Sequence, residues 1–168
     1  GTRRAFGTAL GAAALLGLAP LAFAQDFPAR NKPIRIVVGF TAGGGTDAQA
    51  RIVAQKLGEV LGTSVIVDNR PGAGGTLGAA IAAKAPADGY TLLVHSAGHL
   101  VNPWIYKGLS YDTLKDFAGV TPMASLPNVL VTSPSHFADV KDLVAKAKAK
   151  PGGLNYGSAG NGSATHMN

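Results

Sequence analysis

The chain has 168 residues, no cysteine and a formal net charge of +6. Without cysteine it can form neither disulfides nor thiolate chemistry, and a chain of this length can build a core without such cross-links. The basic residues are scattered or lie together on one expected helix face, and aromatic residues are not interleaved with them. A solvated helix face explains this pattern better than a nucleic-acid site, so we expect no nucleic-acid partner. The lysines of that face are Lys141, Lys146, Lys148 and Lys150.

The first 24 residues have the pattern of an export signal. Arg3 and Arg4 precede an apolar stretch from Ala9 to Phe23, and Ala22-Phe23-Ala24 supplies small residues before a cleavage site at Gln25. The apolar stretch is shorter than the roughly twenty residues that span a bilayer, which argues against a membrane anchor. The sequence therefore predicts a signal peptide over 1–24 and a periplasmic protein. The paired arginines leave Sec and twin-arginine export both open.

The next element is a strand over Ile34–Val38 that leads into a glycine-rich loop. A helix is expected over Thr46–Leu61, with Thr46 and Gln49 as a capping box and Gly62 as its stop. A strand, a glycine loop and a helix N-terminus together form a cradle for an anion, because free backbone N–H groups and the positive end of the helix dipole converge there.

Two nucleotide sites share part of this pattern. A P-loop is excluded in practice, because Gly45 stands where that motif requires lysine. The spacing Gly43-x-Gly45-x-x-Ala48, with Asp68 at the end of the following strand, also fits a dinucleotide-binding loop. Residues 39–42, however, separate the strand from these glycines, where a Rossmann turn would be tight. A dinucleotide-binding oxidoreductase that uses the Gly43–Ala48 loop remains the alternative interpretation.

Strands and helices continue to alternate along the chain, which predicts an α/β fold with a mainly parallel, doubly wound sheet. Ligands of such sheets bind beyond the carboxyl ends of the strands. The further strands are expected over Ser64–Val67, Thr91–His95, Phe117–Ala124, Val129–Thr132 and Leu154–Tyr156, and the further helices over Thr76–Lys84 and Asp139–Lys150.

A second glycine loop, between Leu154 and His166, repeats the order of strand, loop and helix start. Together with Asn69-Arg-Pro-Gly-Ala-Gly-Gly75, Ala87-Asp-Gly-Tyr-Thr-Leu92 and Asn102-Pro103, it gives the chain from Pro33 to His166 a close resemblance to the substrate-binding proteins of tripartite tricarboxylate transporters, the Bug receptors. Family members usually carry proline at the position of Gly39, so the first loop of this chain is expected to be less stiff.

The resemblance implies a periplasmic binding protein type II-like fold with two lobes, each built on a mainly parallel doubly wound sheet. It implies that residues 25–126 belong to lobe 1 and 127–168 to the start of lobe 2, and that the chain is a fragment, because family members continue for about as many residues again. The implied function is capture of an organic acid, such as a di- or tricarboxylate, for the membrane components of a tripartite transporter. We expect a monomer that is not an enzyme and needs no cofactor.

Three loops are candidates for the ligand-binding site. No catalytic residue is expected, since Val94–Gly98 lacks the first glycine of a nucleophile elbow, and the four histidines lack metal-ligand spacing, so no metal site is expected. Asp47 is expected to cap its helix, with a contact to a ligand amine as the alternative, and Arg70 to be a structural donor. The candidate binding residues are Phe40, Thr41, Ala42, Gly43, Gly44 and Gly45 in the first loop; Ser96 and His99 after the third strand; and Ser158, Asn161, Gly162, Ser163 and Thr165 in the second glycine loop.

Overall fold

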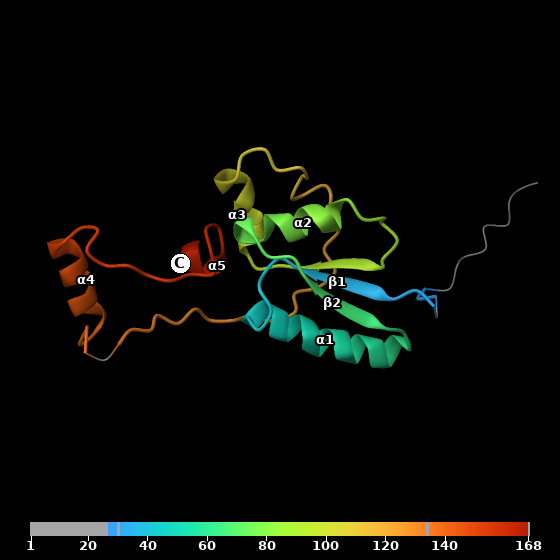
Figure 1. Cartoon of the computed structure of the whole chain (residues 1–168), viewed down its shortest axis with the longest axis horizontal. Coiled ribbons are helices and arrows are strands. Elements are labelled where there is room, and N and C mark those ends of the chain that lie inside the picture. Colours follow the sequence, from blue (N-terminus) through green and yellow to red (C-terminus); the bar gives the residue numbers. More distant parts are fainter. Residues whose placement is uncertain (1–26, 30, 134, 168) are drawn as a thin grey trace, which may run out of the picture.

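A computed structural model describes residues 27–29, 31–133 and 135–167, so the expected signal peptide lies outside the described residues. Strands and helices alternate along the chain (Figure 1). In chain order the elements are β1 (Ile34–Val38), α1 (Gly45–Leu61), β2 (Val65–Asn69), the 3-10 turn η1 (Ala73–Gly75), α2 (Thr76–Ala83), β3 (Thr91–Val94), α3 (Gly98–Ile105), α4 (Val140–Ala149) and α5 (Ala164–Met167).

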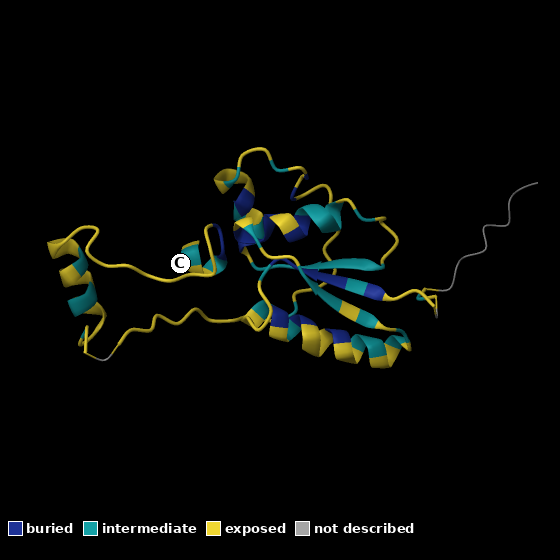
Figure 2. Cartoon of the chain, in the orientation of Figure 1, coloured by how far each residue is buried: buried dark blue, intermediate teal, exposed yellow. Residues whose placement is uncertain are grey.

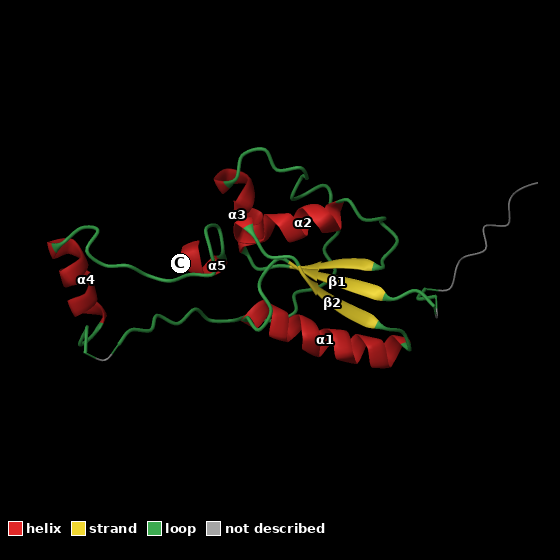
Figure 3. Ribbon diagram, in the orientation of Figure 1, coloured by secondary structure: helices red, strands yellow, loops and turns green. Residues whose placement is uncertain are grey.

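The three strands form a parallel sheet in the order β2-β1-β3. Ile34 pairs with Val65 on one side of β1, and Arg35 pairs with Thr91 on the other. Helix α1 packs on β1 and β2, whereas α2 packs on β1 and β3 from the opposite face (Figure 3). This arrangement confirms the doubly wound α/β fold. The connection from β1 to β2 crosses one face of the sheet, and the connection from β2 to β3 crosses the other. The carboxyl ends of β1 and β3 therefore border the crevice where open sheets bind ligands.

The core lies around β1, because this strand has a neighbour on each side and a helix on each face (Figure 2). Ile34, Ile36, Val37 and Val38 are at most 1% exposed. Ala50 and Ala54 of α1 pack against Ile36 and Val38, and their small side chains let the helix approach closely. Arg35 is the one charged residue of β1. Its guanidinium pairs with Asp68 of β2, which satisfies both charges at the edge of the core.

Helix α1 ends as predicted but begins differently. Gly62 follows its last residue in the left-handed conformation, with φ 63°, which confirms the predicted stop. The helix begins at Gly45, with Gly44 as an N-cap that makes no side-chain hydrogen bond, so the predicted Thr46–Gln49 capping box is wrong. The Asp47 carboxylate in the first turn accepts the backbone N–H of Gly43, so it ties the preceding loop to the helix.

The part after β3 departs most from expectation. Helix α4 forms as predicted, with the Asp139 carboxylate capping it through the N–H of Asp142 at 2.8 Å, and the four lysines of its face are exposed. Within the described residues, however, no strand forms over the last three predicted segments, Phe117–Ala124, Val129–Thr132 and Leu154–Tyr156. The β-branched composition of Val129–Thr132 favours a strand, but a strand also needs a hydrogen-bonded neighbour. The division at residue 126 into two lobes stays a prediction.

Candidate ligand-binding cleft

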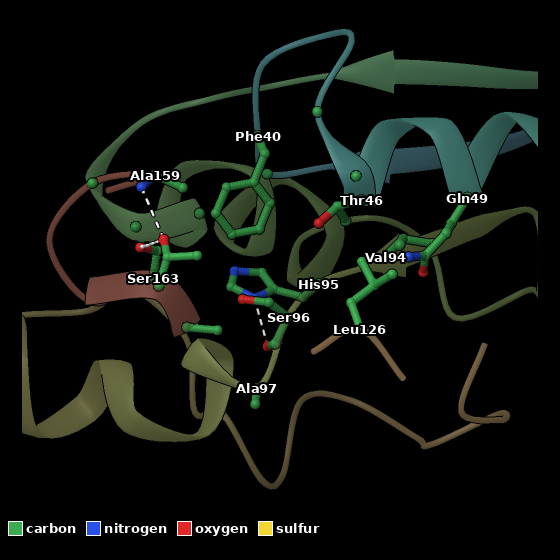
Figure 4. Close-up of a pocket in the computed structure, with 18 of the residues that line it drawn as sticks. Phe40, Thr46, Gln49, Val94, His95, Ser96, Ala97, Leu126, Ala159 and Ser163 are labelled. Carbon is green, nitrogen blue, oxygen red and sulfur yellow. Dashed lines mark hydrogen bonds between the residues drawn. The ribbon is translucent and has the colours of Figure 1, made fainter. Parts of the chain in front are cut away.

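A cleft of about 1020 Å³ lies beyond the carboxyl ends of β1 and β3 (Figure 4). Its walls come from segments that are far apart in the sequence. They are the loop after β1 with the start of α1, the loop after β2, the loop after β3, the irregular segment 121–128, and the second glycine loop with the start of α5. The two predicted glycine loops therefore meet at one site, as their repeated pattern suggested.

The first loop contributes four of its six predicted residues to the cleft lining: Phe40, Thr41, Gly44 and Gly45. Ala42 and Gly43 are outside the lining. Gly43 has φ 85°, so here glycine permits a turn, while its N–H donates to Asp47 at 2.8 Å. Gly44 has φ −76° and ψ 167°, which any residue can adopt. Its small size, rather than its conformational freedom, is therefore the feature that matters in the cleft.

Asp47 lies under this loop and is only 2% exposed. The Arg51 guanidinium beside it, together with hydrogen bonds from the Gly43 N–H and the Asn69 amide, lowers the pKa of this carboxyl to about 2. Both carboxylate oxygens are engaged by groups of the chain itself. This geometry agrees with the structural role expected for Asp47. It leaves the carboxylate little room to accept hydrogen bonds from a ligand amine.

The second glycine loop contributes Asn161, Ser163 and Thr165 to the lining, while Ser158 and Gly162 are outside it. The Thr165 hydroxyl accepts the N–H of Ala159 at 3.0 Å and lies 3.2 Å from the Ser163 hydroxyl, so these side chains close the loop on itself. Tyr106, directly after α3, donates to the Asn161 carbonyl at 2.7 Å. That bond fastens the loop to the first part of the chain.

After β3 the structure places one predicted residue in the cleft and one behind it. Ser96 lines the cleft, but His99 does not. The His99 ring stacks on Tyr111 at 6.0 Å and meets Phe117 edge to face at 5.0 Å, because its place in α3 directs it into an aromatic cluster. His95 lines the cleft instead, with its ring 5.2 Å from that of Phe40. In the described structure the His95 Nε2 and the Ser96 hydroxyl have no hydrogen-bond partner.

Several lining residues were not predicted from the sequence. The loop Pro71–Gly75 belongs to a motif that the sequence displays plainly, and its position after β2, at the carboxyl end of a strand, could have marked it. No local pattern marks Tyr106 or the wall formed by Thr121–Leu126, because folding alone brings these residues to the cleft.

The dinucleotide interpretation requires Asp68 to be available for a ribose hydroxyl. In the structure Asp68 accepts hydrogen bonds from Arg35 and Arg70, with the Arg70 Nε at 2.9 Å from Oδ1, and it does not line the cleft. The same pairing gives Arg70 the structural role expected for it. This geometry disfavours the dinucleotide reading of the loop.

Burial of His99 leads to a prediction about pH. Desolvation, reinforced by the nearby His95, lowers the pKa of His99 to about 4, and desolvation also lowers that of His95. Below pH 6.5 the unfolded chain therefore binds more protons than the folded one. The contribution of these neutral histidines to stability is complete above pH 6.5 and falls as the pH drops from 6.5 towards 4. We expect His99→Phe to melt at a higher temperature than the wild type at pH 5 and to flatten this dependence. Melting curves of both whole proteins between pH 4 and 8 measure the difference. The same pH dependence of the melting temperature in the two proteins would contradict the prediction.

The described residues hold neither a cluster of metal ligands nor a membrane-spanning helix. Among residues 27–29, 31–133 and 135–167, no three His, Cys, Asp or Glu side chains cluster as metal ligands would. The helices in the same part of the chain are all too short or too polar to cross a membrane.

The three-stranded fold matches solved periplasmic binding proteins. The R. palustris protein Rpa4515, solved with adipate, superposes with a TM-score of 0.76 and 41% identity, over 82% of this chain and 46% of that one. The periplasmic binding protein BugD superposes with a TM-score of 0.65 and 31% identity, over 83% and 47% of the two chains. The fold and the cleft therefore define part of a periplasmic binding protein.

The sequence comparisons identify the family. Residues 49–168 match the tripartite tricarboxylate transporter family receptor, and the chain belongs to this family. A relative from Pseudomonas sp. (strain P51), described as the UPF0065 protein in the tcbD-tcbE intergenic region, is 44% identical over 84% of this chain and 42% of its own length. Protein BugT of Bordetella pertussis is 40% identical over 92% of this chain and 48% of its own. The chain thus spans less than half the length of these relatives.

Proposed function

We propose that this chain is the N-terminal half of a periplasmic receptor that captures an organic acid carrying two or three carboxylates. The receptor delivers the acid to the membrane components of a tripartite transporter. It acts as a monomer, is exported by its first 24 residues, and carries out no chemistry of its own. On this proposal the division into lobes falls near residue 126, and the backbone of both glycine loops grips one carboxylate.

The meeting of two glycine loops in one cleft is the observation that carries this proposal. Each loop precedes a helix start, at Gly45 and at Ala164, and backbone N–H groups at such positions favour an anion. Phe40 and His95 supply a less polar wall beside them, and Ser96 and Thr41 add hydroxyls. A carboxylate held by charge-assisted hydrogen bonds gains about 1.5–3 kcal/mol from each, which is enough for a micromolar dissociation constant after the cost of ordering.

Ligand-induced stabilisation of the whole mature protein tests this function. The panel consists of adipate, succinate and citrate as the proposed class, with glucose and NAD as the other classes. At 1 mM, an acid with a micromolar dissociation constant stabilises the folded state by about 4 kcal/mol, so its melting temperature shift is large. We expect a shift with at least one of the three acids and none with glucose or NAD. A shift with NAD alone would favour the oxidoreductase, and no shift with any acid would overturn the proposal.

A further inference from the structure

We propose that Arg51 sets the carboxylate affinity of the first loop by neutralising the buried Asp47 carboxylate that holds this loop in place. Arg51 is thus a positioning residue that acts through Asp47 and does not itself line the cleft. The proposal rests on the proposed function, because it concerns how the same cleft tolerates an anionic ligand.

The first step is the way in which Asp47 holds the loop. One carboxylate oxygen, Oδ2, accepts the backbone N–H of Gly43 at 2.8 Å. The other, Oδ1, accepts the Asn69 amide at 2.9 Å, and the same amide donates to the Phe40 carbonyl at 3.1 Å. Asp47 and Asn69 therefore fasten both ends of the segment Phe40–Gly43.

The second step is the charge that this arrangement introduces. Asp47 is buried, and its pKa is lowered to about 2, so it carries a full negative charge at neutral pH. Gly44 and Gly45, which line the cleft, lie within three residues of it. A fixed negative charge directly behind an anion site opposes the binding of a carboxylate, and the protein interior screens that repulsion weakly.

The third step is the role of Arg51, one helical turn further along α1. Its Nε lies 2.9 Å from Asp47 Oδ2, and its Nη2 donates to the Asn69 side-chain oxygen at 3.0 Å. The first contact cancels the charge of Asp47. The second turns the Asn69 amide so that its NH₂ group faces Asp47 and Phe40. The guanidinium is about half exposed and does not enter the cleft, so its effect on a ligand is exerted through these two neighbours.

Four variants of the whole mature protein distinguish an effect of charge on ligand affinity from an effect of altered loop structure. Arg51→Gln leaves Asp47 uncompensated, and we expect it to weaken binding of a panel acid about tenfold. Asp47→Asn removes the negative charge and keeps one side-chain oxygen to accept the Gly43 N–H, so its affinity should equal or exceed that of the wild type. The double variant Asp47→Asn/Arg51→Gln removes both charges and should recover wild-type affinity within about threefold. A purely structural role predicts the opposite, a double variant that binds no better than Arg51→Gln.

Lys56→Gln is the matched control. It makes the same change in net charge on the same helix, at an exposed position that pairs with Glu59 and lies away from the cleft. Its affinity should match the wild type. Calorimetric titration with each panel acid that the wild type binds measures all five proteins, and circular dichroism verifies their folding. Wild-type affinity in Arg51→Gln, or an unrecovered double variant, overturns the inference while the receptor function stands. A wild type that binds none of the acids overturns the function itself.

Discussion

Gly44→Val is expected to weaken binding of a carboxylate ligand at least tenfold, about 1.4 kcal/mol, in a protein that still folds. Gly44 lines the cleft at the start of α1, and its backbone angles suit a β-branched residue. A Cβ added there meets only the Thr41 carbonyl oxygen, at an ordinary 3.5 Å. The new side chain therefore occupies the space in front of the loop amides without straining the fold.

Gly119→Val is the control for this variant. Gly119 is exposed and outside the cleft lining, and a Cβ added there has nothing within 4 Å. We expect its affinity to equal that of the wild type. Calorimetry with a panel acid compares the three proteins, and circular dichroism checks their folding. A folded Gly44→Val protein with wild-type affinity would mean that the first loop is only a turn, and that the acid binds elsewhere.

Gly39→Val is expected to lower the free energy of unfolding by about 3 kcal/mol. Gly39 is buried at the end of β1, where its backbone faces the 3-10 turn η1. A Cβ at Gly39 would lie 2.8 Å from the Gly75 Cα and 2.9 Å from the Gly75 carbonyl oxygen. Both neighbours are backbone atoms, so no side chain can rotate away, and the loops after β1 and β2 must separate.

Urea unfolding of the whole protein measures this loss, again with Gly119→Val as the comparison, which should stay within about 0.5 kcal/mol of the wild type. An unchanged midpoint in Gly39→Val would show that the two loops are not in backbone contact. The structure thus gives a physical reason for glycine at position 39: the adjacent backbone leaves no room for a side-chain carbon.

The sequence was sufficient to predict the elements whose signals are local. The apolar run Ile34–Val38 had to be a buried strand and Gly62 had to stop α1, because each follows from the residue type and its immediate neighbours. The two glycine loops could also be recognised, since backbone conformation and helix starts depend on short segments.

Features that depend on distant partners could not be predicted in this way. His99 was expected in the cleft, but the direction of a side chain from α3 depends on the aromatic residues packed against it, Tyr111 and Phe117. Tyr106 was not expected at all, because its hydrogen bond reaches a residue 55 positions later. The capping box failed because the helix begins one residue earlier, at Gly45, which places Thr46 inside the first turn.

The segment Asn128–Ser133 has a consequence for handling this chain. Val129, Leu130 and Val131 are 74%, 68% and 81% exposed, and the described backbone of this segment pairs with no strand. A short run of β-branched and aliphatic residues without charge or proline is the composition that forms intermolecular β-sheet when it is left uncovered. Residues 25–168 produced alone would therefore self-associate as concentration rises. The substitution Leu130→Lys would place a charge in this run, oppose strand pairing between molecules and keep such a preparation in solution.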